Sequence, residues 1–444
     1  MSIAGRQQRM DEHSLREEIK RLIRDYYELR FADAKREDVP VSGKVFDSEE
    51  LSAIVDAALD GHWTEGKYSL IFEQKLKEFI GVSHAMVVNS GSSANLLAFM
   101  TLCSYQLGER RIQKGDEVIT VAAGFPTTIN PIIQAGCIPV FCDINLGTYD
   151  INIVHLNKAI SRKTKAIMLA HTLGNPFNVD AVVDVCKKHG LWLIEDNCDG
   201  LGSTYAEKLT GTFGDISTIS FYPAHHITLA EGGAVCTNNP KLSKIARSIR
   251  DWGRDCYCKT GRDNTCGKRF GHRLGDLPEG YDHKYIYSEL GYNLKNTDIN
   301  IAIGIPQLAK LPGFIEKRKE NFKALHDRFA KWEKYFILPK ATEQADPSWF
   351  GFPLTLTERF PTKRAEFLRF LAEKKIATRL LFGGNITKQP YFKAYGIPYR
   401  VAESLANTDI VMNNAFWIGV SPLTGAAEIE KVISAFEEYL KENL

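Results

Sequence analysis

The sequence predicts an α/β protein built on a mostly parallel sheet, with a smaller α+β domain at its C-terminal end. Short apolar runs alternate with segments of helical periodicity from about residue 86 to residue 221. Such runs are typical of strands buried on both faces, and strands that alternate with helices form parallel sheets through right-handed crossovers. Beyond about residue 245 the alternation stops, and the last third of the chain mixes helical and strand patterns again.

The elements follow in order along the chain. Strands are expected at Met86–Asn89, Glu117–Val121, Pro139–Asp143, Ala166–Ala170, Leu191–Ile194 and Ile216–Phe221. Helices are expected at 10–30, Ser48–Leu59, Tyr68–Ile80, Leu96–Leu107, Ile153–Ala159 and Asp180–His189. In the first helix one stripe collects Leu15, Ile19, Leu22, Ile23 and Tyr26, which favours a surface or interface helix.

The chain divides into three predicted parts. Residues 1–40 form an N-terminal helical segment, 41–310 a large α/β domain, and 311–444 a small C-terminal domain. A helix expected from Asn300 runs into a long basic helix near Gly313–Trp332, with which the small domain begins. A strand near Phe350–Leu356 and helices at Arg364–Lys374 and Ala426–Glu442 follow.

Composition narrows the class of protein. The 444 residues are 44% hydrophobic and 25% charged with a net charge of +2, so neither a nucleic-acid partner nor another polyanion is expected. The N-terminus lacks the apolar core of a secretory signal, and no apolar run reaches about 18 residues. We therefore expect a cytoplasmic protein without a membrane span, in which nine cysteines do not form disulfides.

Two features at strand ends point to a ligand. The apolar run Leu191–Ile194 ends in Glu195 and Asp196, and ligands of α/β proteins bind at the carboxyl ends of strands. Earlier, Ser90-Gly91-Ser92-Ser93 separates a strand from a helix. Free N–H groups at such a helix start bind phosphate, although a serine cap needs no ligand.

Residues 195 to 233 resemble a known family. Enzymes of the sugar aminotransferase branch of the pyridoxal-phosphate (PLP) enzymes carry E-D-x-x-[QH]-x-x-G, then G-D, then S-F-x-x-x-K-x-x-x-x-G-E-G-G. The chain matches nearly all of this pattern, but His225 stands where the family has the lysine that binds PLP. No lysine lies between Lys208 and Lys241. The resemblance implies the aspartate aminotransferase fold, fold type I, over roughly residues 45 to 440.

The resemblance also implies roles for individual residues. Ser92, Ser93 and Ser220 match contacts to the cofactor phosphate, Phe125 the aromatic side chain stacked on the pyridine ring, and Asp196 the carboxylate at the pyridinium nitrogen. Asp199 stands where the family has Gln or His near the ring hydroxyl. Asn293, in Gly291-Tyr292-Asn293, matches an asparagine that reaches the partner's cofactor in the family's homodimer.

Histidine at position 225 changes the expected chemistry. A PLP transaminase uses its lysine to hold the cofactor aldehyde and to move a proton, and histidine can do only the second. We therefore expect a catalytic His225 and a non-covalently held pyridoxamine phosphate (PMP), which suits dehydration rather than amine transfer. A non-catalytic relative is the alternative.

Three cysteines lie in the polar, glycine-rich segment between Arg250 and Tyr292. Cys256, Cys258 and Cys266 supply three thiolates, and Cys198 is the candidate for the fourth ligand of an iron–sulfur or zinc site. The spacing C-x57-C-x-C-x7-C resembles the 2Fe–2S signature of the PMP-dependent 3-dehydrases of 3,6-dideoxysugar synthesis. The other cysteines are expected in the core: Cys103, Cys137, Cys142, Cys186 and Cys236.

This resemblance implies a complete activity. PMP and a 2Fe–2S cluster would serve C3 dehydration and deoxygenation of a nucleotide-linked 4-keto-6-deoxyhexose, with a CDP-linked sugar as the expected substrate. Electrons would come from a separate NADH-dependent iron–sulfur flavoprotein reductase. The rival functions are a sugar aminotransferase, which calls for lysine at 225, and a zinc-stabilised protein without enzymatic activity.

Overall fold

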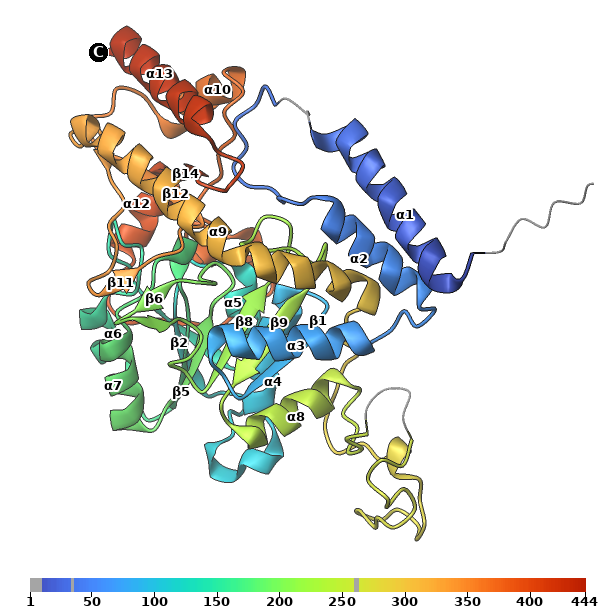
Figure 1. Ribbon diagram of the computed structural model, residues 1–444. Helices are drawn as coiled ribbons and strands as arrows, with labels where there is room; N and C mark the ends of the chain where they lie inside the picture. The colour runs from blue at the N-terminus through green and yellow to red at the C-terminus, as the bar shows by residue number, and fades with distance from the viewer. Residues whose placement is uncertain (1–9, 33–35, 259–262) are drawn as a thin grey trace, which may run out of the picture.

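The computed structural model describes residues 10–32, 36–258 and 263–444, and its centre is an eight-stranded sheet (Figure 1). The strand order is β1 (His84–Val88), β9 (Gly233–Thr237), β8 (Ile216–Ser220), β5 (Trp192–Asp196), β4 (Thr164–Ala170), β2 (Glu117–Val121), β3 (Ile138–Cys142) and β13 (Arg400–Val401). All neighbours from β13 to β8 are parallel, and only β9 runs antiparallel to both of its neighbours. The predicted, mostly parallel sheet is confirmed.

Helices cover both faces of this sheet. They are α3 (Lys67–Ile80), α4 (Gly91–Leu102), α5 (Pro126–Gln134), α6 (Ile153–Ala159), α7 (Val179–His189) and α8 (Pro240–Arg250). A further helix, α2 (Ser48–Leu59), packs against the long helix α9 (Asp298–Phe329). Successive strand residues point to opposite faces, so Ile194 packs with Leu97 of α4 and Leu242 of α8, whereas Leu193 packs with Val182 of α7. The strands are therefore buried on both sides, as their continuous apolar sequences indicated.

The C-terminal part forms a second layer with its own core. A small antiparallel sheet has the order β10 (Phe336–Ile337), β12 (Gly351–Leu356) and β14 (Ala415–Gly419). The helices here are α10 (Arg364–Glu373), α11 (Pro390–Ala394), α12 (Ala406–Asn414) and α13 (Ala426–Asn443). A third sheet joins β11 (Ala345–Asp346) to the hairpin β6 (Thr204–Tyr205) and β7 (Lys208–Leu209).

Two helices agree with the expectation in place and differ in extent. The long helix α9 (Asp298–Phe329) joins the helix expected from Asn300 to the long basic helix in one element, which runs through the predicted domain boundary at 310. The division into domains therefore remains an interpretation. The first helix, α1 (Glu12–Tyr27), has no buried residue, and Leu15, Leu22 and Tyr26 of its apolar stripe are exposed.

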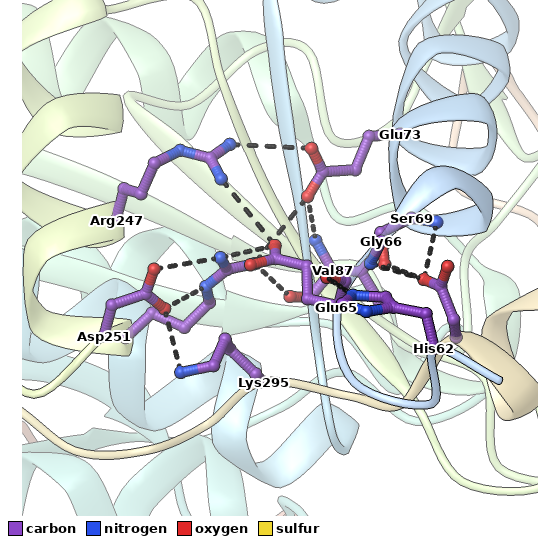
Figure 2. Close-up of polar contacts among 11 residues, drawn as sticks. His62, Glu65, Gly66, Ser69, Glu73, Val87, Arg247, Asp251 and Lys295 are labelled. Atoms are coloured by element: carbon purple, nitrogen blue, oxygen red, sulfur yellow. Dashed lines mark hydrogen bonds and ion pairs between the residues drawn. The ribbon is translucent and has the colours of Figure 1, made fainter. Parts of the chain in front are cut away.

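A network of charges clamps the end of α8. The guanidinium of Arg250, 1% exposed, donates to Glu65 at 2.5 Å, to Asp251 at 2.8 Å and to the carbonyl of Val87 at 3.0 Å. Figure 2 shows Arg247 approaching Glu73 and Lys295 approaching Asp251 around this centre. Because a buried cation is tolerated only when it is paired, the network fixes how α8, β1 and the entry to α3 meet.

The segment from Asp251 to Tyr292 leaves the body at this clamp and projects outward (Figure 1). In its described residues the only regular element is a 3₁₀ turn at His283–Tyr285, and bridges Asp251–Asn293 and Arg254–Tyr287 close its base. We call residues 251–292 the cysteine loop. Its large apolar side chains are widely exposed: Trp252, Tyr257, Phe270, Tyr285, Tyr287 and Leu290. The predicted long irregular segment is confirmed, and exposure on this scale is typical of a surface that meets a partner.

Asp298, at the start of α9, organises the neighbouring helix α3. Its carboxylate accepts hydrogen bonds from the N–H groups of Gly66, Tyr68 and Ser69 and from the hydroxyl of Ser69, at 2.6–3.1 Å. We expect Asp298→Asn to lower the free energy of unfolding by about 2 to 3 kcal/mol, because the amide turns a donor toward these donors. Denaturant unfolding measures this. Asp184→Asn, on the exposed side of α7, is the control, and equal stability of both variants would contradict the role of Asp298.

Candidate active site

A cavity of about 1030 Å³ opens at the carboxyl ends of the parallel strands. Its walls come from the starts of α4 and α5, the end of β5, the turn after β8 and the C-terminal part around residues 379–391. Most of the residues predicted to bind the cofactor line it: Ser92, Phe125, Asp196, Asp199, Ser220, His225 and also Cys198. Ser93 and Asn293 do not.

Asp196 is the last residue of β5 and is 4% exposed. Its Oδ2 accepts from Asn95 Nδ2 at 2.8 Å and from Thr128 Oγ1 at 2.6 Å, while Oδ1 accepts from the N–H of Cys198 at 3.2 Å. Asn95 is held in turn by Thr218, whose hydroxyl donates to it at 2.6 Å. These donors fix the carboxylate in the cavity wall.

The adjacent carboxylate, Glu195, points to the other side of the strand and does not line the cavity. It accepts from the N–H groups of Gly211, Phe213 and Gly214 and pairs with His171 Nε2 at 3.0 Å. Burial alone would raise the pKa of Glu195, but His171 and these amides lower it overall. Glu195 therefore anchors the segment after β5, and Asp196 is the carboxylate available to a ligand.

The start of α4 offers a seat for an anion. Ser90 caps this helix, its Oγ accepting from the N–H of Ser93 and donating to the Ser93 hydroxyl, so Ser93 is engaged in the cap. Ser92 is exposed toward the cavity, and Ser220 faces it from the end of β8. A Cβ at Gly91 would lie 2.4 Å from that of Ser220, so only glycine lets the two segments meet. Hydroxyls, free amides and the helix dipole suit a phosphate.

Phe125 stands on the wall between this seat and the C-terminal part. It caps α5, its ring is half exposed, and it meets Phe382 edge to face with ring centroids 5.9 Å apart. An aromatic face left open in a cavity is suited to stacking on a planar ring. The seat, Phe125 and Asp196 together thus match the phosphate, ring and nitrogen of a pyridoxal-type cofactor.

His225 and Asp199 lie next to each other in the wall of the cavity. Its imidazole stacks on Phe350 with centroids 5.0 Å apart, and Nδ1 lies 3.4 Å from Asp199 Oδ1 without forming a hydrogen bond. Burial, with the nearby charge of Arg318, lowers the pKa of His225 to about 3, and burial, with Asp196, raises that of Asp199 to about 8. Both shifts favour the neutral forms of the two groups. His226 instead bonds the carbonyl of Ser348 at 2.8 Å and does not line the cavity.

The cysteines fall into three sets. Cys256, Cys258 and Cys266 interact with one another in the cysteine loop, where the hydroxyl of Thr265 contributes most to lowering the pKa of Cys258, to about 7. Cys198 lies in the cavity, and burial raises the pKa of its thiol. The third set is confirmed as core, with burial raising each pKa to about 12: Cys103, Cys137, Cys142, Cys186 and Cys236.

Two histidines that sequence reasoning did not single out stand beside the loop cysteines. The ligand atoms of Cys266, His272 and His283 all lie within 4.8 Å of one another, and the imidazoles stack at 3.8 Å. His272 Nε2 and His283 Nδ1 are buried and unbonded. Within the described residues no such group contains Cys198, so one chain does not bring the four predicted cysteines together. That ligand set remains a prediction.

Asn293 lies at the base of the cysteine loop, exposed and away from the cavity of its own chain. Its contact with a partner's cofactor stays a prediction, because this contact would lie between two chains. No helix in the described part of the protein is both long and apolar enough to cross a membrane.

Comparison with known proteins identifies the family of the chain. Residues 45–437 match the sequence model of the DegT/DnrJ/EryC1/StrS aminotransferase family. The chain is 54% identical over 434 residues to the lipopolysaccharide biosynthesis protein RfbH of Salmonella typhimurium, covering 97% of this chain and 99% of that protein. It is 48% identical over 421 residues to dTDP-4-dehydro-2,6-dideoxy-D-glucose 3-dehydratase of Saccharopolyspora spinosa, covering 94% and 90%.

A solved structure shows the same architecture. GDP-4-keto-6-deoxy-D-mannose-3-dehydratase of E. coli, with bound hydrated PLP, aligns with a TM-score of 0.81 at 29% identity. The alignment covers 90% of this chain and 99% of that one. The predicted fold-type-I architecture of PLP enzymes is confirmed.

The role of Asp196 can be tested by cofactor binding. We expect Asp196→Asn to weaken PMP binding about 10- to 100-fold, because a charged hydrogen bond to the ring nitrogen is lost. Titration of PMP by fluorescence measures this, with Asp327→Asn on the exposed side of α9 as the control. Phe125→Leu should weaken binding less and leave the fold intact. Unchanged affinity in both cavity variants would place the cofactor elsewhere.

Proposed function

Because the chain belongs to the DegT/DnrJ/EryC1/StrS aminotransferase family yet has histidine at position 225, we propose that it is a PMP-dependent sugar 3-dehydratase. Its proposed substrate is a nucleotide-linked 4-keto-6-deoxyhexose, with the CDP-linked sugar as the first candidate. The observation that carries the proposal is that His225, and no lysine, lines a cavity whose other described walls suit a pyridoxal-type cofactor.

Each group of residues in the cavity would have its own role in binding the cofactor or in moving a proton. The start of α4, with Ser92 and Ser220, would hold the phosphate, Phe125 the ring and Asp196 the protonated ring nitrogen. When bound, PMP supplies the amine that joins the C4 ketone and the electron sink that lets the C3 hydroxyl leave. His225 takes up the proton that must be removed from the cofactor carbon. Two relatives named above are 3-dehydratases by name, which supports dehydration at C3 as the reaction.

The outer cavity is suited to the nucleotide end of the substrate. Arg379 lines it and, among its described lining residues, is the one permanent cation. Tyr391, Gln389 and Asn130 add polar groups on the same side. A guanidinium beside neutral donors fits a sugar nucleotide, whose diphosphate is the most strongly charged part.

We also propose that the cysteine loop carries a 2Fe–2S cluster that delivers single electrons after the hydroxyl has left. The support is chemical: Cys258 interacts with both Cys256 and Cys266, and its pKa is lowered to about 7, which favours the thiolate that binds a soft metal. The fourth ligand would be Cys198 or one of the histidines beside Cys266. The electron donor would be a separate NADH-dependent flavoprotein reductase, and zinc in place of iron is the rival occupant.

A homodimer is part of the proposal. The exposed aromatic side chains of the cysteine loop need a cover, and Asn293 lies at the base of this surface, pointing to no site in its own chain. We propose that the partner's cavity receives Asn293, as the resemblance implies.

Aminotransferase activity is the second candidate, and position 225 separates the two. We expect His225→Lys to bind PLP covalently and to lose at least about 100-fold of its dehydration rate, because lysine forms the bond that histidine cannot. Borohydride reduction and peptide mass mapping identify the modified residue. His225→Asn is the control that should remain unlabelled. Covalent labelling of the wild type at any lysine of the cavity region would overturn the argument from His225.

Metal content tests the cysteine loop. We expect Cys256→Ser, Cys258→Ser and Cys266→Ser to lose iron, acid-labile sulfide and visible absorption, because a hydroxyl is a poor ligand for a soft metal. Exchange of solvent oxygen-18 into the substrate at C3 should persist, since it needs only PMP and His225. Cys103→Ala in the core is the control.

Two further outcomes refine or refute this assignment. A Cys198→Ser variant that keeps its cluster would assign the fourth position to His272 or His283. Full reductase-dependent turnover in the three loop variants would refute electron delivery by the loop, and one zinc without sulfide in the wild type would favour the rival occupant.

A further inference from the structure

Arg318 is a fully buried cation that the proposed chemistry does not use. It lies in the second half of α9 with 1% of its surface exposed. Among the described residues no carboxylate forms an ion pair with it, in contrast to the equally buried Arg250, which has two acidic partners at hydrogen-bonding distance. Asp199 interacts with it electrostatically but forms no ion pair. A buried charge without a direct ionic partner costs several kcal/mol, so its presence calls for an explanation.

The guanidinium is bound instead by main-chain carbonyls around His225. Nη2 donates to the carbonyl of His225 itself at 3.3 Å. Nη1 donates to the carbonyls of Trp349 at 3.2 Å and Phe350 at 3.5 Å. One side chain thus joins the turn that carries the imidazole to the segment that leads into β12.

Phe350 makes this connection relevant to the imidazole. Its ring stacks on His225 with an interplanar angle of 28°, and the Arg318 guanidinium carbon lies 5.9 Å from the centroid of the same ring. Arg318 therefore contacts the backbone of His225 and also the Phe350 ring on which the imidazole stacks. Nδ1 of His225 has no hydrogen bond, and the only hydrogen-bonding interaction of the imidazole in the described structure is with the backbone of Cys198, so the Phe350 ring and the anchored turn add to what orients the side chain.

We infer that Arg318 is a positioning residue that holds His225 in the orientation required for proton removal. The inference rests on the proposed 3-dehydratase function. A neutral side chain of similar length would fill the space but release the three carbonyls, and the imidazole could then rotate on its turn. A displacement of about 1 Å in a catalytic group costs on the order of 100-fold in rate.

The test compares Arg318→Met and Arg318→Lys with Arg328→Met. Arg328 lies on the same helix but is 45% exposed and paired with Glu430, which makes it a matched control. Three quantities are measured: unfolding by denaturant, PMP affinity, and exchange of the cofactor C4′ proton with deuterium from solvent. The exchange uses PMP and CDP-linked 4-keto-6-deoxyglucose, without a reductase.

We expect Arg318→Met to bind PMP within about threefold of the wild type and to lose on the order of 100-fold in exchange rate. Arg318→Lys, which keeps the charge and can reach one carbonyl, should recover part of the loss, and Arg328→Met should match the wild type. Exchange within twofold of the wild type in a folded Arg318→Met would overturn the inference.

Other results are equally decisive. If Arg318→Met does not fold, Arg318→Lys decides: undiminished exchange overturns the inference, and reduced exchange with normal PMP binding supports it. If the wild type itself shows no exchange with CDP-, dTDP- or GDP-linked substrate, the proposed function fails, and the positioning role fails with it. Exchange in the wild type and equally in Arg318→Met removes the positioning role alone.

Discussion

The architecture of the site depends on one buried carboxylate at the end of a strand. Asp196 can remain in the wall of the cavity only because α4, α5 and its own following turn each direct a donor at it. The same three segments carry the anion seat, the open ring of Phe125 and the thiol of Cys198. The hydrogen bonds that satisfy the Asp196 carboxylate therefore also fix the positions of the groups around it. The fold and the cavity depend on the same set of contacts.

Local sequence patterns predicted most of the sheet, and the family resemblance predicted many of the residues that line the cavity. The bounds of β2 were correct to the residue, and Asp196, Phe125, Ser220 and His225 do converge. β9 was missed. Its first residue, Gly233, is glycine because it lies against the backbone of Ser90, and hydrophobic periodicity does not reveal a contact between residues so far apart in the chain. Asn95, Thr128 and Arg318 were missed for a related reason: they act on residues far away in the chain, and each alone resembles an ordinary helix residue.

In the cysteine loop, the sequence predicted which thiols lie in one segment but not which other side chains lie beside them. The spacing of Cys256, Cys258 and Cys266 identified thiols that do lie together, because all three belong to one short segment. The position of Cys198 relative to them is set by the clamp at Arg250, which directs the loop away from the body, and by whatever covers the loop's exposed aromatic side chains. His272 and His283 were overlooked because only folding brings them to Cys266.

The two halves of α9 are attached to different parts of the molecule. Gln307 is bonded to Glu50 in the large part, whereas Asn321 is bonded to the carbonyls of Val420, Ser421 and Thr424 in the C-terminal part. Pro306 and Pro312 lie before Arg318 and weaken the helix there. Any tilt of the C-terminal part would hinge at these prolines and carry Arg318 with it. Narrowing of the cavity and movement of the turn that carries His225 would then be a single mechanical event.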